Sequence, residues 1–543
     1  MTTRPLGAQI SHMLKDRGVD VIFGIPGVHN QEMYRGIEEA GITHVLARHE
    51  QGAGFMADGY ARATGRPGVA YVISGPGLCN IMTPMGQAYS DSVPMLVISS
   101  VLDETAATRG QLHQMKDQEG AARAVCDWSE TARTAEAAYG LIDRALTEFA
   151  TRRSRPKYIQ VPIKLLEAAA NTAPSASDWP VGSVDEADPL RLEPLRELLR
   201  ASKRPLFIFG GGSVRNLNVT LGAGNGGDQV SELVQGMGAA TLMTYAGRGR
   251  IPADYPLNFG SLLARPESEK VIASADLVIA VGTELSEVDL WRDALGHKAR
   301  LVRIDLDPEV LTDRHRADMP IHAGAYGHLI NTLIMMQDEP AKTGWSAAEV
   351  QDFRTRMRAE INAERPGIVP VADALKAALP TDTMIYSDMT QFAYAAKEVY
   401  PMDLPGHWHH PYGFGTLGYA LPAAIGGKIG VGDKPVIAIA GDYGFQYTLQ
   451  ELAVAVELGL PLPILIWDNG KLGEIEDSMV RAQIAPNAVH QRNPDFLKLA
   501  EAYGAGAVNL TDLADLKQVI AEAFAADGPT IIRVPADIAL TSS

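Results

Sequence analysis

The sequence predicts an α/β protein built from three doubly wound parallel-sheet domains. Short apolar segments alternate with helical patterns in three successive blocks, which is typical of parallel sheets covered by helices. The 543-residue chain is long enough for roughly three or four domains. A hydrophobic fraction of 46%, with 52 glycines and 6% aromatic residues, favours a compact globular protein over a disordered or fibrous one.

The first block predicts a domain over residues 1–170. Ile10, Met13 and Leu14 mark the apolar face of an early helix. Buried strands are expected at residues 21–23, 69–74, 95–98 and 158–161, with a further strand-like segment at 43–46. Residues 171–189 are rich in Ala, Pro, Ser and Asp and lack periodicity, so we expect a linker there.

The second block predicts a middle domain over residues 190–336, and the third predicts a domain over residues 366–536. A polar helical stretch at 338–366 separates them. In the middle domain, strands are expected at 205–209, 276–281 and 301–304. In the third domain, they are expected at 384–386, 436–440, 463–467 and 530–534, with a helix at 448–458.

Composition also excludes some classes of function. The net charge of −17 disfavours binding to nucleic acid or to an anionic membrane, because Lys and Arg supply the attraction in both cases. Cys79 and Cys126 are the two cysteines, too few for a disulfide-stapled scaffold, and we expect both to be buried thiols. Residues 1–10 lack the basic and apolar pattern of a secretory signal, so we expect a cytoplasmic protein that acts on small molecules.

Two predicted strands of the third domain end in loops with polar side chains. The strand at 436–440 leads into Gly441-Asp442-Tyr443-Gly444, and the strand at 463–467 leads into Asp468-Asn469-Gly470. Both loops emerge at the carboxyl edge of a parallel sheet, where ligands bind. A carboxylate and an amide oxygen are donors that suit Mg²⁺. Taken separately, Asp442 could instead cap a turn and Asn469-Gly470 could be an ordinary tight turn.

In combination, these loops resemble the Gly-Asp-Gly to Asn-Asn motif of thiamine-diphosphate enzymes. The resemblance implies Mg²⁺ held by the side chains of Asp442 and Asn469 and by the carbonyl of Lys471, and it places Gly441, Tyr443 and Gly444 beside the cofactor diphosphate. Tyr443 replaces the usual third glycine, and Asp468 replaces the first asparagine of the motif. Neither departure removes a metal ligand.

The segment Arg48-His49-Glu50-Gln51-Gly52 resembles the family's activating-glutamate segment. The resemblance implies that Glu50 hydrogen-bonds the aminopyrimidine ring, so that the ring's exocyclic nitrogen can take the proton from the thiazolium C2 atom. Without the resemblance, Glu50 would be an acidic residue that stabilises a helix N-terminus. Pro26 and Asn80 lie in Gly-Ile-Pro-Gly and Gly-Pro-Gly-Leu-Cys-Asn segments that resemble neighbouring family loops.

Two further segments resemble cofactor contacts of the family. Gly413-Phe414-Gly415-Thr416-Leu417-Gly418 is similar to the segment that bends the cofactor, which implies that Leu417 lies between its two rings and that the Gly415 carbonyl accepts from the exocyclic amine. Leu417 could also be an ordinary core residue. Thr390 and Gln391 stand where the family contacts the diphosphate.

The resemblance covers nearly the whole chain and orders the domains as pyrimidine-binding, middle and diphosphate-binding, as in acetolactate synthases and 2-oxo acid decarboxylases. It implies a site shared between chains, hence a homodimer at least, with a homotetramer usual. The flavin-binding segments of the biosynthetic synthases are replaced by Gly282-Thr283-Glu284-Leu285 and Ser261-Leu262-Leu263-Ala264-Arg265, which makes FAD doubtful. Gly210-Gly211-Gly212 lacks the dinucleotide pattern and predicts a tight turn.

The reaction and substrate rest on two other segments. His113 and Gln114 lie where decarboxylases carry adjacent histidines and synthases carry Phe-Gln, and His113 could relay a proton or be a solvated loop residue. Glu474 and Ile475 lie in an acidic segment that resembles decarboxylases of 5-guanidino-2-oxopentanoate, in which Glu474 would pair with a cationic substrate tail. This segment could also be a solvated helix face. We therefore expect a 2-oxo acid decarboxylase; the alternatives are acetolactate synthase and a non-catalytic cofactor-binding regulator.

Overall fold

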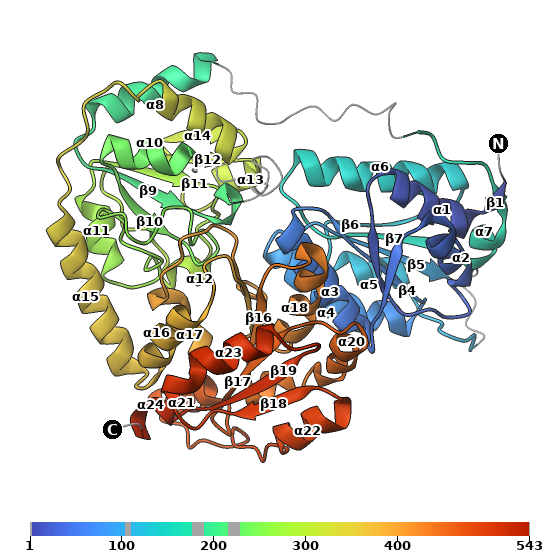
Figure 1. The fold of residues 1–543 in the computed structure, drawn as a ribbon. Coiled ribbons are helices and arrows are strands. Elements are labelled where there is room, and N and C mark those ends of the chain that lie inside the picture. The colour runs from blue at the N-terminus through green and yellow to red at the C-terminus, as the bar shows by residue number, and fades with distance from the viewer. Residues whose placement is uncertain (1–2, 104–109, 176–188, 215–228, 542–543) are drawn as a thin grey trace.

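A computed structural model describes residues 3–103, 110–175, 189–214 and 229–541. Figure 1 shows three lobes in chain order, each built around its own parallel sheet, with long helices packed against the sheets. The predicted fold class is therefore confirmed. A short antiparallel pair, β1 (Arg4–Pro5) and β8 (Ala169–Ala170), also ties the two ends of the first domain together.

The first sheet has six parallel strands with polar loops at its carboxyl edge. In spatial order they are β3 (Thr43–Leu46), β2 (Val21–Gly24), β4 (Gly68–Val72), β5 (Met95–Val101), β7 (Lys157–Pro162) and β6 (Trp128–Thr131). The helices around this sheet are α1 (Leu6–Asp16), α2 (Gln31–Ala40), α3 (Glu50–Thr64), α4 (Pro76–Ser90), α5 (Gln118–Arg123), α6 (Ala135–Thr151) and α7 (Ile163–Glu167). Separate apolar clusters on its two faces show that the sheet is buried from both sides, which explains the apolar runs of its central strands.

The middle sheet has five parallel strands. Their spatial order is β10 (Ala240–Met243), β9 (Pro205–Phe209), β11 (Leu277–Val281), β12 (Arg300–Asp305) and β13 (Met319–His322). Its helices are α8 (Pro189–Ala201), α10 (Gln229–Met237), α11 (Ser268–Ser274), α12 (Glu287–Leu290), α13 (Pro308–Leu311) and α14 (Ala325–Ile334). The predicted glycine turn is present as the 3₁₀ turn η2 (Gly211–Ser213) directly after β9.

The third sheet again has six parallel strands. Their spatial order is β15 (Trp408–His409), β14 (Met384–Ser387), β16 (Val436–Gly441), β17 (Pro463–Asp468), β19 (Thr530–Pro535) and β18 (Gly506–Asn509). Its helices are α16 (Ile368–Ala378), α17 (Gln391–Val399), α18 (Ala420–Val431), α19 (Asp442–Phe445), α20 (Leu452–Glu457), α21 (Gly473–Arg481), α22 (Phe496–Tyr503), α23 (Leu516–Phe524) and α24 (Ile538–Thr541). Because β16 and β17 are direct neighbours, the loops that follow them lie side by side.

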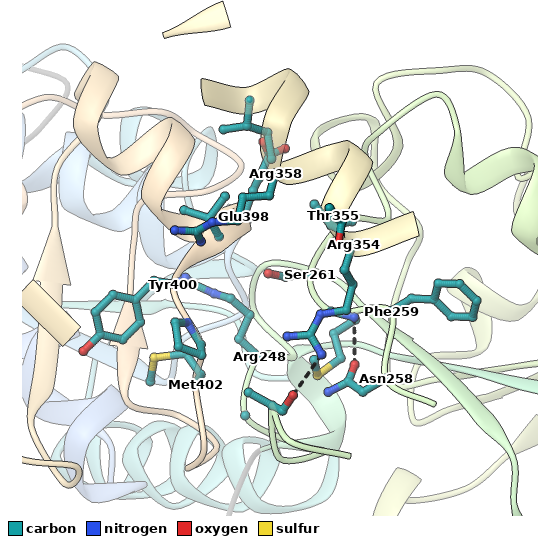
Figure 2. Close-up of a pocket in the computed structure, with 18 of the residues that line it drawn as sticks. Arg248, Asn258, Phe259, Ser261, Arg354, Thr355, Arg358, Glu398, Tyr400 and Met402 are labelled. Atoms are coloured by element: carbon teal, nitrogen blue, oxygen red, sulfur yellow. Dashed lines mark hydrogen bonds between the residues drawn. The ribbon is translucent and has the colours of Figure 1, made fainter. Parts of the chain in front are cut away.

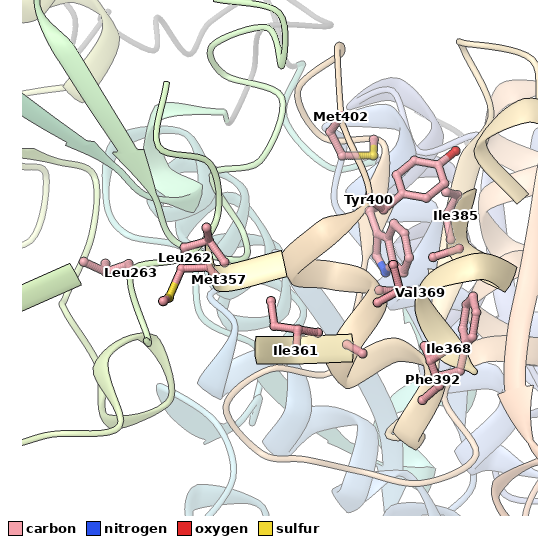
Figure 3. Packing of buried hydrophobic residues seen from close by; sticks show 14 of the residues in the cluster. Leu262, Leu263, Met357, Ile361, Ile368, Val369, Ile385, Phe392, Tyr400 and Met402 are labelled. Atoms are coloured by element: carbon pink, nitrogen blue, oxygen red, sulfur yellow. The ribbon is translucent and has the colours of Figure 1, made fainter. Parts of the chain in front are cut away.

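The third domain packs against both of the others. Helix α15 (Ala347–Glu364) joins it to the middle domain, and one apolar cluster runs from Leu262 and Leu263 through Met357 and Ile361 into the third domain (Figure 3). Helix α3 of the first domain crosses α18 so closely that a Cβ added at Gly59 would lie 1.9 Å from the carbonyl oxygen of Ala423. Glycine is therefore required at this crossing.

Some sequence-based expectations need correction. Cys79 is exposed, because it lies outside the face of α4 that buries Leu78 and Ile81, whereas Cys126 is buried as expected. The helix expected at 448–458 begins as a 3₁₀ turn, η3 (Leu449–Glu451), before α20. Of the expected linker, residues 176–188 lie outside the described residues. Within the described ranges, no helix is long and apolar enough to cross a membrane.

Candidate active site

The two loops expected to bind metal do meet at the carboxyl edge of the third sheet. Gly441 pairs with Trp467 at the ends of β16 and β17. The Asp442 carboxylate is buried, and its Oδ2 atom accepts from the backbone N–H of Gly470 at 2.7 Å. The side chain of Asn469 lies in the same loop, where its Oδ1 atom accepts from the N–H of Lys471 at 3.2 Å. All three predicted metal-binding positions are thus brought together.

Asn493 is a site residue that the sequence motifs did not reveal. Its Nδ2 atom donates to Asp442 Oδ2 at 2.6 Å and to Asp468 Oδ1 at 2.7 Å, so it bridges the two carboxylates. It comes from the loop before α22, 51 positions after Asp442, and no spacing in the sequence points to it.

The electrostatics around Asp442 favour a bound cation. Burial raises the pKa of the Asp442 carboxyl, and the neighbouring Asp468 raises it further, while Asn493 and the Gly470 N–H act in the opposite direction. Asp468 is itself paired with Arg533 Nε at 2.5 Å, so a divalent cation would act chiefly on the Asp442 carboxylate, whose charged form is disfavoured by burial. One carboxylate, one amide oxygen and one backbone carbonyl form a donor set that fits Mg²⁺.

Two glycines keep the space beside these loops open for a diphosphate, because a side chain at either position would fill it. A Cβ added at Gly444 would lie 2.6 Å from Asp388 Oδ2, and one added at Gly441 would lie 3.4 Å from Thr390. Thr390 is the N-cap residue of α17, whose first backbone N–H groups are suited to an anion. Tyr443 packs edge-on against the ring of Tyr447 at a centroid distance of 5.5 Å.

Gln391 is hydrogen-bonded at both ends of its side chain. Its Oε1 atom accepts from Asn469 Nδ2 at 3.1 Å, and its Nε2 atom donates to Asp477 Oδ2 at 3.0 Å. The side chain therefore links the metal loop to helix α21, and both of its polar ends are already occupied. In this geometry Gln391 positions Asn469, and its expected contact with the diphosphate stays a prediction.

The segment expected to bend the cofactor lies next to the same loops. Leu417 is half-buried, and its Cδ2 atom lies 3.7 Å from the position of a Cβ added at Gly444. Gly415 has φ +68°, a left-handed conformation that favours glycine. The buried Asp388 accepts from the Gly418 N–H at 2.8 Å, which fixes this segment, and burial raises the pKa of Asp388 to about 6.

Glu50 begins helix α3 in the first domain. Its carboxylate is 8% exposed and accepts from Asn80 Nδ2 at 2.9 Å, and a Cβ added at Gly77 would lie 3.5 Å from it. The His49 side chain caps the helix by accepting from the Gln51 N–H. Glu50 and Asn80 are thus held together, and Gly77 in the first turn of α4 leaves space beside the carboxylate; their cofactor contacts stay predictions.

His29 is a second site residue that sequence reasoning missed. It follows Pro26 and Gly27 in the loop after β2, and its Nδ1 atom lies 2.7 Å from Ser74 Oγ. Its ring meets the ring of His113 edge-on, with the centroids 5.0 Å apart. Burial and the nearby His113 lower the pKa of His29. The only sequence signal was its position two residues after the Gly-Ile-Pro-Gly segment.

The loop of His113 packs closely against the turn at Gly75 in the first domain. His113 has φ +64°, an uncommon conformation for a residue with a side chain. A Cβ added at Gly75 would lie 2.4 Å from the His113 carbonyl oxygen. Gln114 Oε1 accepts from the Gln111 N–H at 3.2 Å. These contacts bring His113 beside His29, so the first domain does carry two neighbouring histidines.

Glu474 lies in the first turn of α21, close to the metal loop. Both of its carboxylate oxygens accept from the Arg365 guanidinium, from Nε at 2.8 Å and from Nη2 at 3.1 Å. This two-pronged geometry shows that the Glu474 carboxylate can receive a planar guanidinium. Ile475 is 50% exposed.

Glu451 connects the third domain to the first domain at the start of helix α3. It belongs to the third domain and is fully buried, and its two oxygens accept from the backbone N–H of Arg48 at 3.2 and 3.0 Å. A Cβ added at Gly52 would lie 2.3 Å from its carboxyl carbon. Glu451 therefore holds the start of the helix that carries Glu50. No hydrogen bond in the described part of the chain joins Glu50 itself to Asp442 or Asn469.

A Glu451→Gln variant is expected to change how stability depends on pH. Burial raises the pKa of Glu451 from 4.5 to about 7 in the folded protein, so between these values the folded state keeps a proton that the unfolded state loses. The free energy of unfolding must therefore fall as the pH rises through this window, by an amount of the order of 3 kcal/mol. The variant lacks this term, so its thermal midpoint is expected to fall less than that of the parent between pH 5 and pH 7.

The exposed Glu501, on helix α22 of the same domain, provides a matched control, since a Glu501→Gln variant makes the same substitution at the surface. If the midpoints of Glu451→Gln and the parent decline in parallel from pH 5 to pH 7, the buried carboxyl does not carry this dependence.

Comparison with known proteins matches all three domains. The N-terminal TPP binding domain of thiamine pyrophosphate enzymes matches residues 4–121, their central domain matches 192–333, and their C-terminal TPP binding domain matches 388–534. The chain is 40% identical to a probable 2-ketoarginine decarboxylase of Pseudomonas aeruginosa, over 98% of this chain and 94% of that protein. It is 30% identical to the large subunit of acetolactate synthase isozyme 3 of Escherichia coli, over 94% of this chain and 90% of that protein. With cofactor loops, domain order and relatives in agreement, the chain belongs to the thiamine pyrophosphate enzyme family and is a thiamine-diphosphate-dependent enzyme.

Proposed function

We propose that this enzyme decarboxylates a 2-oxo acid with a basic side chain, 5-guanidino-2-oxopentanoate being the first choice, and releases an aldehyde and CO2. The observation that carries the proposal is the two-pronged pair between the Arg365 guanidinium and Glu474, one helical turn from the metal loop. A substrate guanidinium has the same shape and charge as the Arg365 head group. The relative from Pseudomonas aeruginosa supports the same substrate.

In this proposal Arg365 is exchanged for the substrate. Arg365 also pairs with Glu364, at 3.3 Å, and can keep that partner when the substrate takes Glu474. Because one guanidinium replaces the other, the partly buried Glu474 carboxylate stays paired with a cation when the substrate binds.

The roles of the remaining residues follow from their positions. Thiamine diphosphate, when bound, supplies the carbon nucleophile and the electron sink for decarboxylation. Asp442, Asn469 and the Lys471 carbonyl would hold Mg²⁺ beside the diphosphate, and Glu50 would hold a proton at the pyrimidine ring nitrogen. The neighbouring His29 and His113 are placed to deliver the proton that replaces the lost carboxylate.

We further propose that the active form is at least a homodimer, with a homotetramer as the expected assembly, in which Glu50 acts on the cofactor of the partner subunit.

The reaction is proposed to need no flavin. The backbone N–H of Gly212 already donates to the Gly282 carbonyl at 2.9 Å, and a Cβ added at Gly210 would lie 2.3 Å from that oxygen. A turn closed in this way does not offer its N–H groups to a dinucleotide.

The experiment that tests the function is a panel of 2-oxo acids assayed with product identification. The enzyme, loaded with thiamine diphosphate and Mg²⁺, is expected to give CO2 and 4-guanidinobutanal from 5-guanidino-2-oxopentanoate, with no requirement for FAD. Acetolactate synthase is the second candidate, favoured by the 30% identical relative. Formation of an acetohydroxy acid from pyruvate without any aldehyde would establish that alternative. No turnover of any 2-oxo acid would favour a cofactor-binding regulator.

A Glu474→Gln variant is expected to separate substrate recognition from chemistry. Removing the charge weakens a charge-assisted hydrogen-bonded pair, so kcat/KM for 5-guanidino-2-oxopentanoate is expected to fall about 10- to 100-fold. Activity on the neutral 2-oxohexanoate, measured in the same assay, is expected to stay within about twofold. The control is Glu501→Gln, which removes an exposed charge from α22. Equal losses on both substrates would show that Glu474 has a structural role instead.

A further inference from the structure

A cavity of about 170 Å³ lies between the middle and third domains, away from the candidate active site. Its walls come from the middle-domain segments around Arg248 and Ser261, from helix α15, and from the segment after α17 that includes Tyr400 (Figure 2). Neither Glu50 nor the metal loop contributes to it. The volume corresponds to about six heavy atoms, since a cavity of roughly 150 Å³ holds benzene.

Arg354, on α15, directs its guanidinium into this cavity (Figure 2). Its Nη1 atom donates to the backbone carbonyl of Ala253 at 3.0 Å, and the described residues offer it no carboxylate partner. The side chain is partly buried, and burial lowers its pKa. A cation in this position has lost water without gaining an opposite charge.

Arg248 lines the same cavity and is even more enclosed, with 4% of its surface exposed. It donates to the carbonyl of Tyr245 at 2.9 Å and to the carbonyl of Lys397 at 3.3 Å, and its guanidinium lies over the Trp408 ring at 4.5 Å. These partners are neutral, and none of the ion pairs found among the described residues includes Arg248. Two guanidinium groups without acidic partners therefore face one cavity.

The other charged groups around the cavity are already paired. Glu398 is the one carboxylate among the described lining residues, and it accepts from the Tyr245 hydroxyl at 2.8 Å and from Arg265 Nε at 3.0 Å. Arg358 pairs with Asp373. The charge left over at the cavity is consequently positive, and Ser261, Asn258 and Thr355 add polar groups to its wall.

We infer that this cavity is a binding site for a small anion, either inorganic phosphate or a short carboxylate, held by Arg354 and Arg248. Both ligand types present several oxygens on one centre, which matches the donor fork of a guanidinium. The volume accommodates an anion of this size and is below the 300–1,000 Å³ that is typical of sites for larger ligands. A bound anion would connect α15 and the middle domain to the end of α17, whose other end carries Thr390 and Gln391.

The test is calorimetric titration of the enzyme saturated with thiamine diphosphate and Mg²⁺, which blocks phosphate binding at the cofactor site. Inorganic phosphate and malonate serve as the two probes at constant ionic strength, and malonate has no keto group that could react. The parent is expected to bind at least one probe, and an Arg354→Gln variant is expected to bind it at least fivefold more weakly. The stronger probe identifies the phosphate or the carboxylate source.

Arg356→Gln is the matched control, because Arg356 lies on the same helix, is exposed, and pairs with Asp352 at 3.0 Å. Its affinity is expected to equal that of the parent. If Arg354→Gln does not fold, Arg354→Lys, which keeps the charge and loses the fork, is expected to bind at least twofold more weakly. Absence of binding by the parent, or equal affinities in the parent and the Arg354 variants, would overturn the inference.

Discussion

A Glu50→Gln variant is expected to lose between about 10²- and 10⁴-fold in kcat while it still binds thiamine diphosphate and Mg²⁺. The amide keeps the size of the side chain and a contact with Asn80, so the helix start should be preserved. It cannot hold a proton at the pyrimidine nitrogen in the way a carboxyl group does. The measurement is kcat under saturating cofactor, together with cofactor affinity from fluorescence quenching.

The control for this prediction is Glu38→Gln on helix α2, an exposed position in the same domain. It is expected to show the activity of the parent. A Glu50→Gln variant with activity within tenfold of the parent would contradict the proposed role of Glu50, and a variant that has lost cofactor affinity as well would indicate a binding role instead.

An Asp442→Asn variant is expected to bind the cofactor with Mg²⁺ at least about 100-fold more weakly than the parent. The carboxylate is the only charged group in the proposed ligand set, and it also accepts from Gly470 and Asn493, so its loss disturbs both the metal and the arrangement of the loops. Activity is expected to vanish at cofactor concentrations that saturate the parent and to be regained partly at high Mg²⁺. Titration of the apoenzyme with thiamine diphosphate at fixed Mg²⁺ gives the affinities.

Asp433→Asn, at an exposed position just before β16, controls for the loss of one negative charge near the same sheet. Its cofactor affinity should match that of the parent. Unchanged affinity in Asp442→Asn would mean that the metal is held elsewhere, and the proposed ligand set would have to be abandoned.

The central strands of all three sheets were predictable from the sequence, and the edge strands mostly were not. Strands such as β4, β9 and β16 are buried on both faces and therefore appear as continuous apolar runs. Among the described strands of the three parallel sheets, five escaped prediction, and all lie at sheet edges: β6, β10, β13, β15 and β18. Edge strands are short and are held on one side only, so their residues need not form a distinctive pattern.

The candidate site shows the same division. Asp442, Asn469 and Glu50 are recognisable because each stands in a segment whose neighbouring residues are constrained by the loop that it forms. Asn493, Arg365 and His29 were missed because their significance comes from contacts across the fold. The Arg365 to Glu474 pair, for example, joins residues 109 positions apart.

What the sequence determined by itself is the family, the order of the domains and the loops that face the cofactor, because these depend on local patterns of strands, glycines and acidic residues. Only the tertiary structure decided which partner each charged side chain has. It paired Glu474 with Arg365, buried Glu451 against the helix of Glu50, and left Arg354 and Arg248 beside a cavity with no acidic partner among the described residues. Such pairings depend on distances between segments that are remote in the chain, and no spacing along the sequence encodes them.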